Sequence, residues 1–138
     1  MIILRGCDDM KRVITFGTFD VFHLGHLNIL QRAAGYGDYL LVGVSTDKLN
    51  FSKKGRYPVY TQDERRAIVR SLRCVDEVFL EYTLEDKEEY VRNYRADVLV
   101  MGDDWTGKFD WLKLMCDVVY LPRTPSVSTT EIVERIRL

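Results

Sequence analysis

The chain has 138 residues, of which 46% are hydrophobic, which is typical of one domain with a core of ordinary size. Its 20 Lys and Arg nearly balance its 21 Asp and Glu, so there is no bulk positive field to attract nucleic acid. No apolar run is long enough to span a bilayer, and the three scattered cysteines, Cys7, Cys74 and Cys116, indicate reduced thiols in a cytoplasm. We therefore expect a cytoplasmic protein with no nucleic-acid partner and no membrane insertion.

The first predicted strand covers residues 13–16, and its almost wholly apolar sequence is typical of a central strand buried on both faces. Residues 1–12 precede this strand, and their apolar part is too short for a signal peptide. We interpret 1–12 as an N-terminal extension and 13–138 as the domain. A turn over 17–26 leads from the strand into a helix predicted over 27–34, whose apolar residues recur at helical spacing.

Strands and helices alternate through the rest of the chain. Further strands are predicted at 39–45, 75–80, 97–101 and 118–121, and further helices at 61–72, 83–94, 110–115 and from 128 to the C-terminus. Two helices begin at capping boxes, Thr61-Gln62-Asp63-Glu64 and Ser128-Thr129-Thr130-Glu131. Residues 46–60, which are polar and contain four cations around Gly55, are predicted to form a loop.

This alternation predicts an α/β fold with a doubly wound parallel sheet of five strands, in the order 3-2-1-4-5. Ligands of such sheets bind beyond the carboxyl ends of the strands, where the strand order reverses. Three turns then converge on one crevice: residues 17–26 after the first strand, 102–105 (Gly-Asp-Asp-Trp) after the fourth, and the last helix start after the fifth.

The first of these turns contains the only two histidines, His23 and His26, three residues apart at a strand-to-helix turn. Backbone N–H groups and the helix dipole favour an anion there, most commonly phosphate. The turn lacks the glycine patterns of dehydrogenases and P-loop kinases, and the chain has no Gly-x-Ser-x-Gly for acyl transfer. This favours phosphoryl or nucleotidyl transfer, in which both imidazoles hydrogen-bond an α-phosphate as it becomes five-coordinate.

Cations elsewhere in the crevice extend this hypothesis. Lys53, Lys54 or Arg56 can hold a second phosphate, although such a loop can equally be merely solvated. Arg123, after the fifth strand, can hold the β- and γ-phosphates together with the N–H groups at the Ser128 cap.

An acidic residue, Asp104, follows the fourth strand. It can accept a hydrogen bond from a ribose hydroxyl or a base amine, bind a metal through water, or merely cap a turn. The sequence assigns no metal ligands.

The His-x-Gly-His turn after Gly17-Thr18-Phe19-Asp20, with Arg123-Thr124-x-x-Val127-Ser128-Thr129-Thr130, resembles the cytidylyltransferase family of the nucleotidyltransferase superfamily. Segments 101–110 and 119–124 are similar to the branch that acts on glycerol 3-phosphate. The resemblance implies a Rossmann-like fold and transfer of CMP from CTP to glycerol 3-phosphate, by direct in-line attack on the α-phosphate. The products are then pyrophosphate and CDP-glycerol, a precursor of teichoic acid. It also implies Mg²⁺ with CTP and a homodimer.

The resemblance further implies roles for individual residues. The catalytic residues are His23, His26, Lys53 and Arg123. The nucleotide-binding residues are Thr18, Phe19, His23, Leu24, Gly25, His26, Asp104, Arg123, Thr124, Ser128, Thr129 and Thr130. The acceptor-binding residues are Lys53 and Lys87, and two helix arginines, Arg65 and Arg73, match family positions of less certain role. The basic loop is about one residue longer than usual in the family, so its second cation is Lys54 or Arg56.

The sequence departs from the family pattern at two further places, and two alternative functions stay open. Pro125-Ser126-Val127 stands where a Gly-Ile pair is usual, and the N-terminal extension has no counterpart. One alternative is a related enzyme with another acceptor or base: ethanolamine phosphate, a sugar phosphate, or adenylylation of FMN. The other is a nucleotide-binding module without catalysis, which the presence of both histidines, the loop lysines and Arg123 disfavours.

Overall fold

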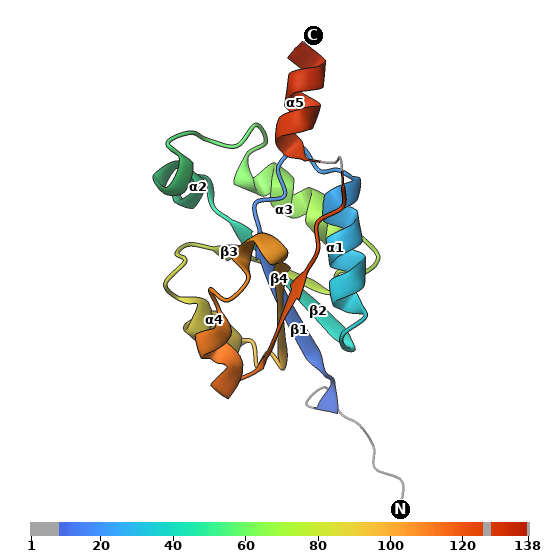
Figure 1. Cartoon of the computed structure of the whole chain (residues 1–138), viewed down its shortest axis with the longest axis vertical. Coiled ribbons are helices and arrows are strands. Elements are labelled where there is room, and N and C mark those ends of the chain that lie inside the picture. Colours follow the sequence, from blue (N-terminus) through green and yellow to red (C-terminus); the bar gives the residue numbers. More distant parts are fainter. Residues whose placement is uncertain (1–8, 126–127, 138) are drawn as a thin grey trace, which may run out of the picture.

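Five parallel strands form the centre of the structure, a computed structural model that describes residues 9–125 and 128–137 (Figure 1). The strands are β1 (Arg12–Gly17), β2 (Tyr39–Ser45), β3 (Glu77–Glu81), β4 (Val98–Gly102) and β5 (Asp117–Leu121). They lie in the order β3-β2-β1-β4-β5, all pairs parallel, so the predicted sheet and strand order are confirmed.

Helices cover both faces of the sheet. The helical elements are α1 (Leu24–Ala34), α2 (Asp47–Lys54), α3 (Gln62–Arg70), α4 (Lys87–Asn93), η2 (Asp103–Trp105), η3 (Asp110–Leu114) and α5 (Thr129–Arg137). Leu30 of α1 and Val69 of α3 pack on one face, while Val91 of α4 and Leu112 of η3 pack on the other. Consecutive residues of β1 pack on opposite faces of the sheet: Val13 packs with the α1 and α3 side, and Ile14 with the α4 and η3 side. Because both faces are covered, this strand is apolar on both.

The loop predicted over residues 46–60 is wrong for its first half, because α2 occupies Asp47–Lys54. The Thr46 side chain caps the helix by accepting a hydrogen bond from the backbone N–H of Leu49, and Gly55 ends it in the left-handed conformation with φ 71°. Leu49 and Asn50 are buried. A polar helix of this kind lacks the apolar repeat from which a helix is usually predicted, and its caps are the remaining signal.

Other helix boundaries also differ from the predictions. Helix α1 begins at Leu24, three residues before its predicted start. Helix α4 begins at Lys87 rather than at residue 83, and the Thr83 hydroxyl instead donates to the Asp86 carboxylate over 2.6 Å ahead of the helix. The predicted capping box of α3 is confirmed, because Thr61 and Glu64 hydrogen-bond each other's backbone N–H groups.

Parts of the predicted organisation fall on residues that the structure does not describe. Residues 1–8 of the predicted N-terminal extension and Ser126-Val127 of the departing motif lie outside the described residues. Residue 12, the last of the predicted extension, is the first of β1. No helix among the described residues is long and apolar enough to cross a membrane.

Candidate active site

A cavity of about 700 Å³ lies at the carboxyl edge of the sheet, where the turn after β1, the η2 turn after β4 and the segment from β5 to α5 converge. The predicted convergence of these three turns is therefore confirmed. Most of the predicted site residues line this cavity: Thr18, Phe19, His23, Gly25, His26, Lys54, Arg56, Asp104, Arg123, Thr124, Ser128, Thr129 and Thr130.

The two histidines form the N-terminal cap of α1. His23 is the N-cap residue, and its Nδ1 accepts a hydrogen bond from the Gly25 N–H over 3.0 Å. His26 Nδ1 accepts from the backbone N–H of His23 over 3.2 Å, which completes a capping box made of imidazoles. The two rings stack with their centroids 3.8 Å apart. The helix start thus fixes both rings relative to each other and to the cavity.

This capping determines the hydrogen-bonding character of the two rings. Because each Nδ1 accepts a hydrogen bond, the proton of each neutral imidazole is on Nε2, which remains a donor. Burial and the neighbouring His23 lower the pKa of His26 to about 3. Burial and the charge of Arg123 lower the pKa of His23 as well. At neutral pH the site therefore offers two neutral Nε2–H donors beside a cationic guanidinium.

Protonation of His26 is expected to make stability depend on pH. Since its folded pKa of about 3 lies below the unfolded value of 6.5, the unfolded chain binds more protons between these values, and the free energy of unfolding decreases as pH falls through them. Titration of His26 changes the free energy of unfolding by at most about 1.4 kcal/mol per pH unit. We expect roughly half of this change, because the ring is partly exposed and solvent screens its charge. Asn at position 26 keeps an acceptor for the His23 N–H but does not titrate.

Urea denaturation of the wild type and His26→Asn between pH 6.5 and 4.5 tests this. We expect the stability advantage of the wild type over the variant to shrink steadily as the pH is lowered. An advantage that stays constant over this range would contradict the lowered pKa of His26.

The turn that presents the histidines has a strained backbone. Phe19 and Val21 have φ values of 56° and 46°, in a region that β-branched residues such as valine rarely adopt. Gly17 allows the Phe19 ring to fold back, since a Cβ at position 17 would lie 2.8 Å from that ring. Phe19 is buried and meets His26 edge-on, with centroids 5.5 Å apart. The Gly-Thr-Phe-Asp sequence thus shapes the support of the second histidine.

Hydrogen bonds of Asp20 to two other segments hold this turn in place. The Asp20 carboxylate accepts hydrogen bonds from the backbone N–H groups of Val59 and Tyr60, over 2.8 and 2.9 Å. The Asp20 carbonyl accepts from the Thr129 hydroxyl over 2.9 Å, so the turn is tied to the start of α5. Ser128 caps α5 by accepting from the Glu131 N–H, as its capping-box sequence predicts. One aspartate therefore connects three walls of the cavity.

Asn50 of α2 also lines the cavity, and it is not among the residues predicted from the sequence. Its Oδ1 accepts a hydrogen bond from the Thr18 hydroxyl over 2.8 Å, while its Nδ2 donates to the Ser45 hydroxyl over 2.8 Å. The side chain is 1% exposed, and its position becomes apparent only once the helix over Asp47–Lys54 is known. Asn50 thereby fixes the orientation of Thr18 at the cavity wall.

Arg65 of α3 is fully buried and connects the chain segments beneath the cavity. Its guanidinium donates to the carbonyl oxygens of Thr18 and Ser45, each over 2.8 Å, to Tyr60 O over 3.0 Å and to the Asp47 carboxylate over 2.7 Å. Arg65, which matches a family arginine of less certain role, thus supports the turn after β1. Arg73 is exposed and does not line the cavity.

The segment after β5 is held against α1. Asn28 Nδ2 donates to the Thr124 hydroxyl over 3.1 Å, and Arg32 donates to the Pro122 carbonyl over 3.2 Å. Arg123 lies between these anchors and is exposed on the cavity lining. Its charge acts on His23, which places the two side chains in one electrostatic environment.

Three of the residues that were predicted to have a catalytic or binding role do not line the cavity. Leu24 is 56% exposed on the first turn of α1. Lys53 belongs to α2 and is influenced by the charges of Glu81 and Lys87, while Lys87 itself is buried in an ion pair with Glu81. The two lysines assigned to the acceptor therefore share one neighbourhood beside the cavity.

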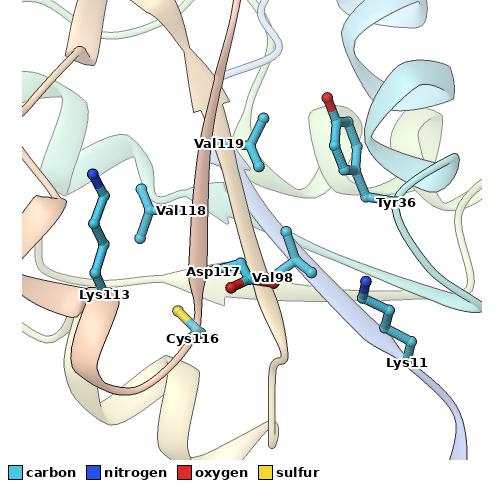
Figure 2. A pocket seen from close by; sticks show the side chains of 8 residues that line it. All are labelled: Lys11, Tyr36, Val98, Lys113, Cys116, Asp117, Val118 and Val119. Carbon is cyan, nitrogen blue, oxygen red and sulfur yellow. The ribbon is translucent and has the colours of Figure 1, made fainter.

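A second cavity, of about 460 Å³, lies away from these residues (Figure 2). It is lined by the start of β4 and by β5, with Val98, Val118 and Val119, and by Lys11 and Tyr36. None of the predicted site residues lines it, so the cavity with the histidine cap is the candidate active site.

Comparison with known proteins shows the family to which the chain belongs. The cytidylyltransferase-like family model matches residues 14–135. The chain is 50% identical to glycerol-3-phosphate cytidylyltransferase of Bacillus subtilis over 92% of this chain and 98% of that protein. It is 46% identical to the enzyme of the same name from Staphylococcus aureus, over 92% of this chain and 96% of that one.

A solved structure has a similar fold. The lipopolysaccharide core biosynthesis protein of Thermoplasma volcanium matches with a TM-score of 0.71 and 26% identity, over 83% of this chain and 98% of that protein. The sheet order, the His-x-Gly-His cap and the family match over nearly the whole chain agree, and the chain belongs to the cytidylyltransferase-like family.

Proposed function

We propose that this chain transfers CMP from CTP to glycerol 3-phosphate, with release of pyrophosphate and formation of CDP-glycerol. The observation that carries the chemistry is the imidazole capping box, which engages both Nδ1 atoms and leaves two Nε2–H donors at a helix N-terminus on the cavity lining. Two relatives that match nearly end to end and are named glycerol-3-phosphate cytidylyltransferases support the choice of substrates.

The reaction needs no covalent intermediate on the enzyme. A phosphate oxygen of glycerol 3-phosphate attacks the α-phosphorus of CTP in line, and pyrophosphate leaves from the opposite side. Negative charge builds up on the α-phosphate oxygens, where His23 and His26 donate hydrogen bonds. Arg123 and the N–H groups at the start of α5 would hold the departing phosphates. Neutral imidazoles suit this role because they donate hydrogen bonds without having to give up a proton.

Magnesium is proposed to enter the site with CTP, as part of the substrate. Among the described residues, no three His, Cys, Asp or Glu side chains lie together as a protein-held metal site requires. Mg²⁺ in nucleotide enzymes is commonly bound by substrate phosphates and one or two carboxylates, and Asp104 on the cavity lining is one candidate. Contact with the ribose or the base remains the other proposed role of Asp104.

A cytoplasmic homodimer is the proposed working form. Cys74 and Cys116, the cysteines among the described residues, are free thiols, as a reducing compartment allows. The family resemblance supports the dimer, and light scattering coupled to size-exclusion chromatography measures it directly.

Pyrophosphate release tests the proposed substrates. Purified protein with Mg²⁺ is offered CTP, ATP, GTP or UTP, each with glycerol 3-phosphate, ethanolamine phosphate, sugar phosphates or FMN. We expect release with CTP and glycerol 3-phosphate alone. Release with another pair would reject the proposed substrates, and nucleotide binding without any release would reject catalysis.

A further inference from the structure

Strand β5 is a free edge of the sheet among the described residues, because it pairs with β4 on one side only. Its residues Val118 and Val119 are half-buried, whereas the neighbouring strand is buried over Val98–Met101. Just before β5, Leu114 is 99% exposed and Met115 is 37% exposed. An edge of this kind offers backbone N–H and C=O groups, and here also apolar side chains, to a further strand.

The second cavity, of about 460 Å³, reaches this free edge. It is lined by Val118 and Val119, which project to opposite sides of β5 (Figure 2). A cavity that contacts both faces of β5 passes its free edge or its first residue, because β4 occupies the other edge. Lys11 lines the same cavity and directly precedes β1, so the chain enters the domain beside β5. The opposite edge strand, β3, lines neither this cavity nor the active-site cavity.

The chain has a segment of matching chemistry in residues 1–8, which lie outside the described residues. Its first four residues, Met1-Ile2-Ile3-Leu4, form a continuous apolar run with two β-branched side chains, a composition that favours a strand. Successive side chains of a strand point to opposite faces, so this run would present two apolar groups to each face. Strand β5 also has an apolar side chain on each face, Val118 on one and Val119 on the other. The run therefore matches the edge on both faces.

The link from this run to β1 is long enough to reach β5. A strand added beyond β5 would lie three strand spacings from β1, which is about 14 Å. Residues 5–11 span at most about 23–25 Å when extended. The path is shortest when residue 4 lies at the amino edge of the sheet, where β1 begins, so the added strand would run antiparallel to β5.

The antiparallel direction also brings opposite charges together. Arg5 directly follows the apolar run, and Asp117 is the exposed first residue of β5. With residue 4 at the amino edge, the guanidinium of Arg5 would lie beside the Asp117 carboxylate. Parallel pairing would instead place Arg5 beyond Leu121, at the other end of the strand.

We infer that residues 1–4 pair with the free edge of β5 as a sixth, antiparallel strand, and that Arg5 pairs with Asp117. Backbone hydrogen bonds of the added strand satisfy the edge, and the apolar run is removed from water. This interaction surface is separate from the active-site cavity and does not depend on the proposed function.

Amide hydrogen exchange of the full chain, measured by mass spectrometry, tests the added strand. We expect the slowest amides of residues 117–121 to exchange about tenfold more slowly in the wild type than in Ile3→Pro, because proline cannot donate to the ladder. The buried strand β4 should exchange alike in both proteins, which confirms an intact fold. Asp8→Pro, outside the proposed strand, is the matched control and should keep the wild-type protection.

A charge exchange tests the direction of the strand. Arg5→Glu and Asp117→Arg should each reduce the protection of residues 117–121 by about two- to fivefold, as the loss of an exposed ion pair would. The double variant Arg5→Glu with Asp117→Arg should regain most of it. Arg5→Glu with Asp63→Arg, at an exposed aspartate of α3, is the matched control and should regain none.

Two results would overturn the inference. One is equal exchange of residues 117–121 in the wild type and Ile3→Pro. The other is protection that rises with protein concentration and persists in Ile3→Pro, since a second copy of the chain would then cover the edge. Protection that Ile3→Pro removes but the double charge variant does not regain would overturn the antiparallel pairing.

Discussion

Replacement of His23 with Asn is expected to lower kcat by about 10²- to 10³-fold while the protein remains folded. His23 has two separate tasks in the structure. Its Nδ1 caps α1 through the Gly25 N–H, and its Nε2–H is left to donate to the α-phosphate. Asn is among the preferred N-cap residues and preserves the first task. Its short side chain cannot place a donor where Nε2 lies, so the second task is lost.

Comparison with His23→Ala separates the two tasks experimentally. Ala removes the cap as well and should cost about 1 kcal/mol of stability relative to Asn. Both variants should have similarly low kcat, with little change in nucleotide affinity, because the hydrogen bond strengthens mainly in the transition state. Wild-type turnover in His23→Asn would show that His23 is only a helix cap.

Replacement of Arg65 with Met is expected to destabilise the protein by about 3–5 kcal/mol, a large part of the 5–15 kcal/mol that holds a typical domain folded. Met fills a similar volume but leaves the Asp47 carboxylate and the carbonyls of Thr18 and Ser45 without their donor. Arg65→Lys keeps the charge but not the planar fork, so it should recover less than half of the loss.

Arg70→Ala is the matched control, since Arg70 is exposed on the same helix. Its free energy of unfolding, measured by urea denaturation, should stay within about 0.5 kcal/mol of the wild type. An Arg65→Met variant as stable as Arg70→Ala would contradict the role of Arg65 as a support of the β1 turn.

Features encoded by local pattern were predictable from the sequence. Alternating strands and helices gave the order of the sheet, and the capping box at Thr61 placed the start of α3. The same reasoning brought His23, Asp104 and Arg123 to one edge of the sheet, because parallel strands all end at that edge.

Features that depend on tertiary contacts were not predictable. Arg65 lies on a helix with several other arginines, and nothing in its spacing distinguishes the buried guanidinium from the exposed ones. Helix α2 lacks an apolar stripe, so Asn50 was hidden in an expected loop. The acceptor role of Lys87 came from resemblance alone, and its partner Glu81 emerged only when β3 and α4 were placed together.

The most direct test of the account is the identity of the phosphorus atom that is attacked. The products of CTP and glycerol 3-phosphate with Mg²⁺ can be followed by ³¹P NMR. Attack on the α-phosphorus predicts equal amounts of CDP-glycerol and pyrophosphate, both lost in His23→Asn. CDP with glycerol 3-diphosphate would show attack at the γ-phosphorus and contradict the proposed geometry around the histidine cap.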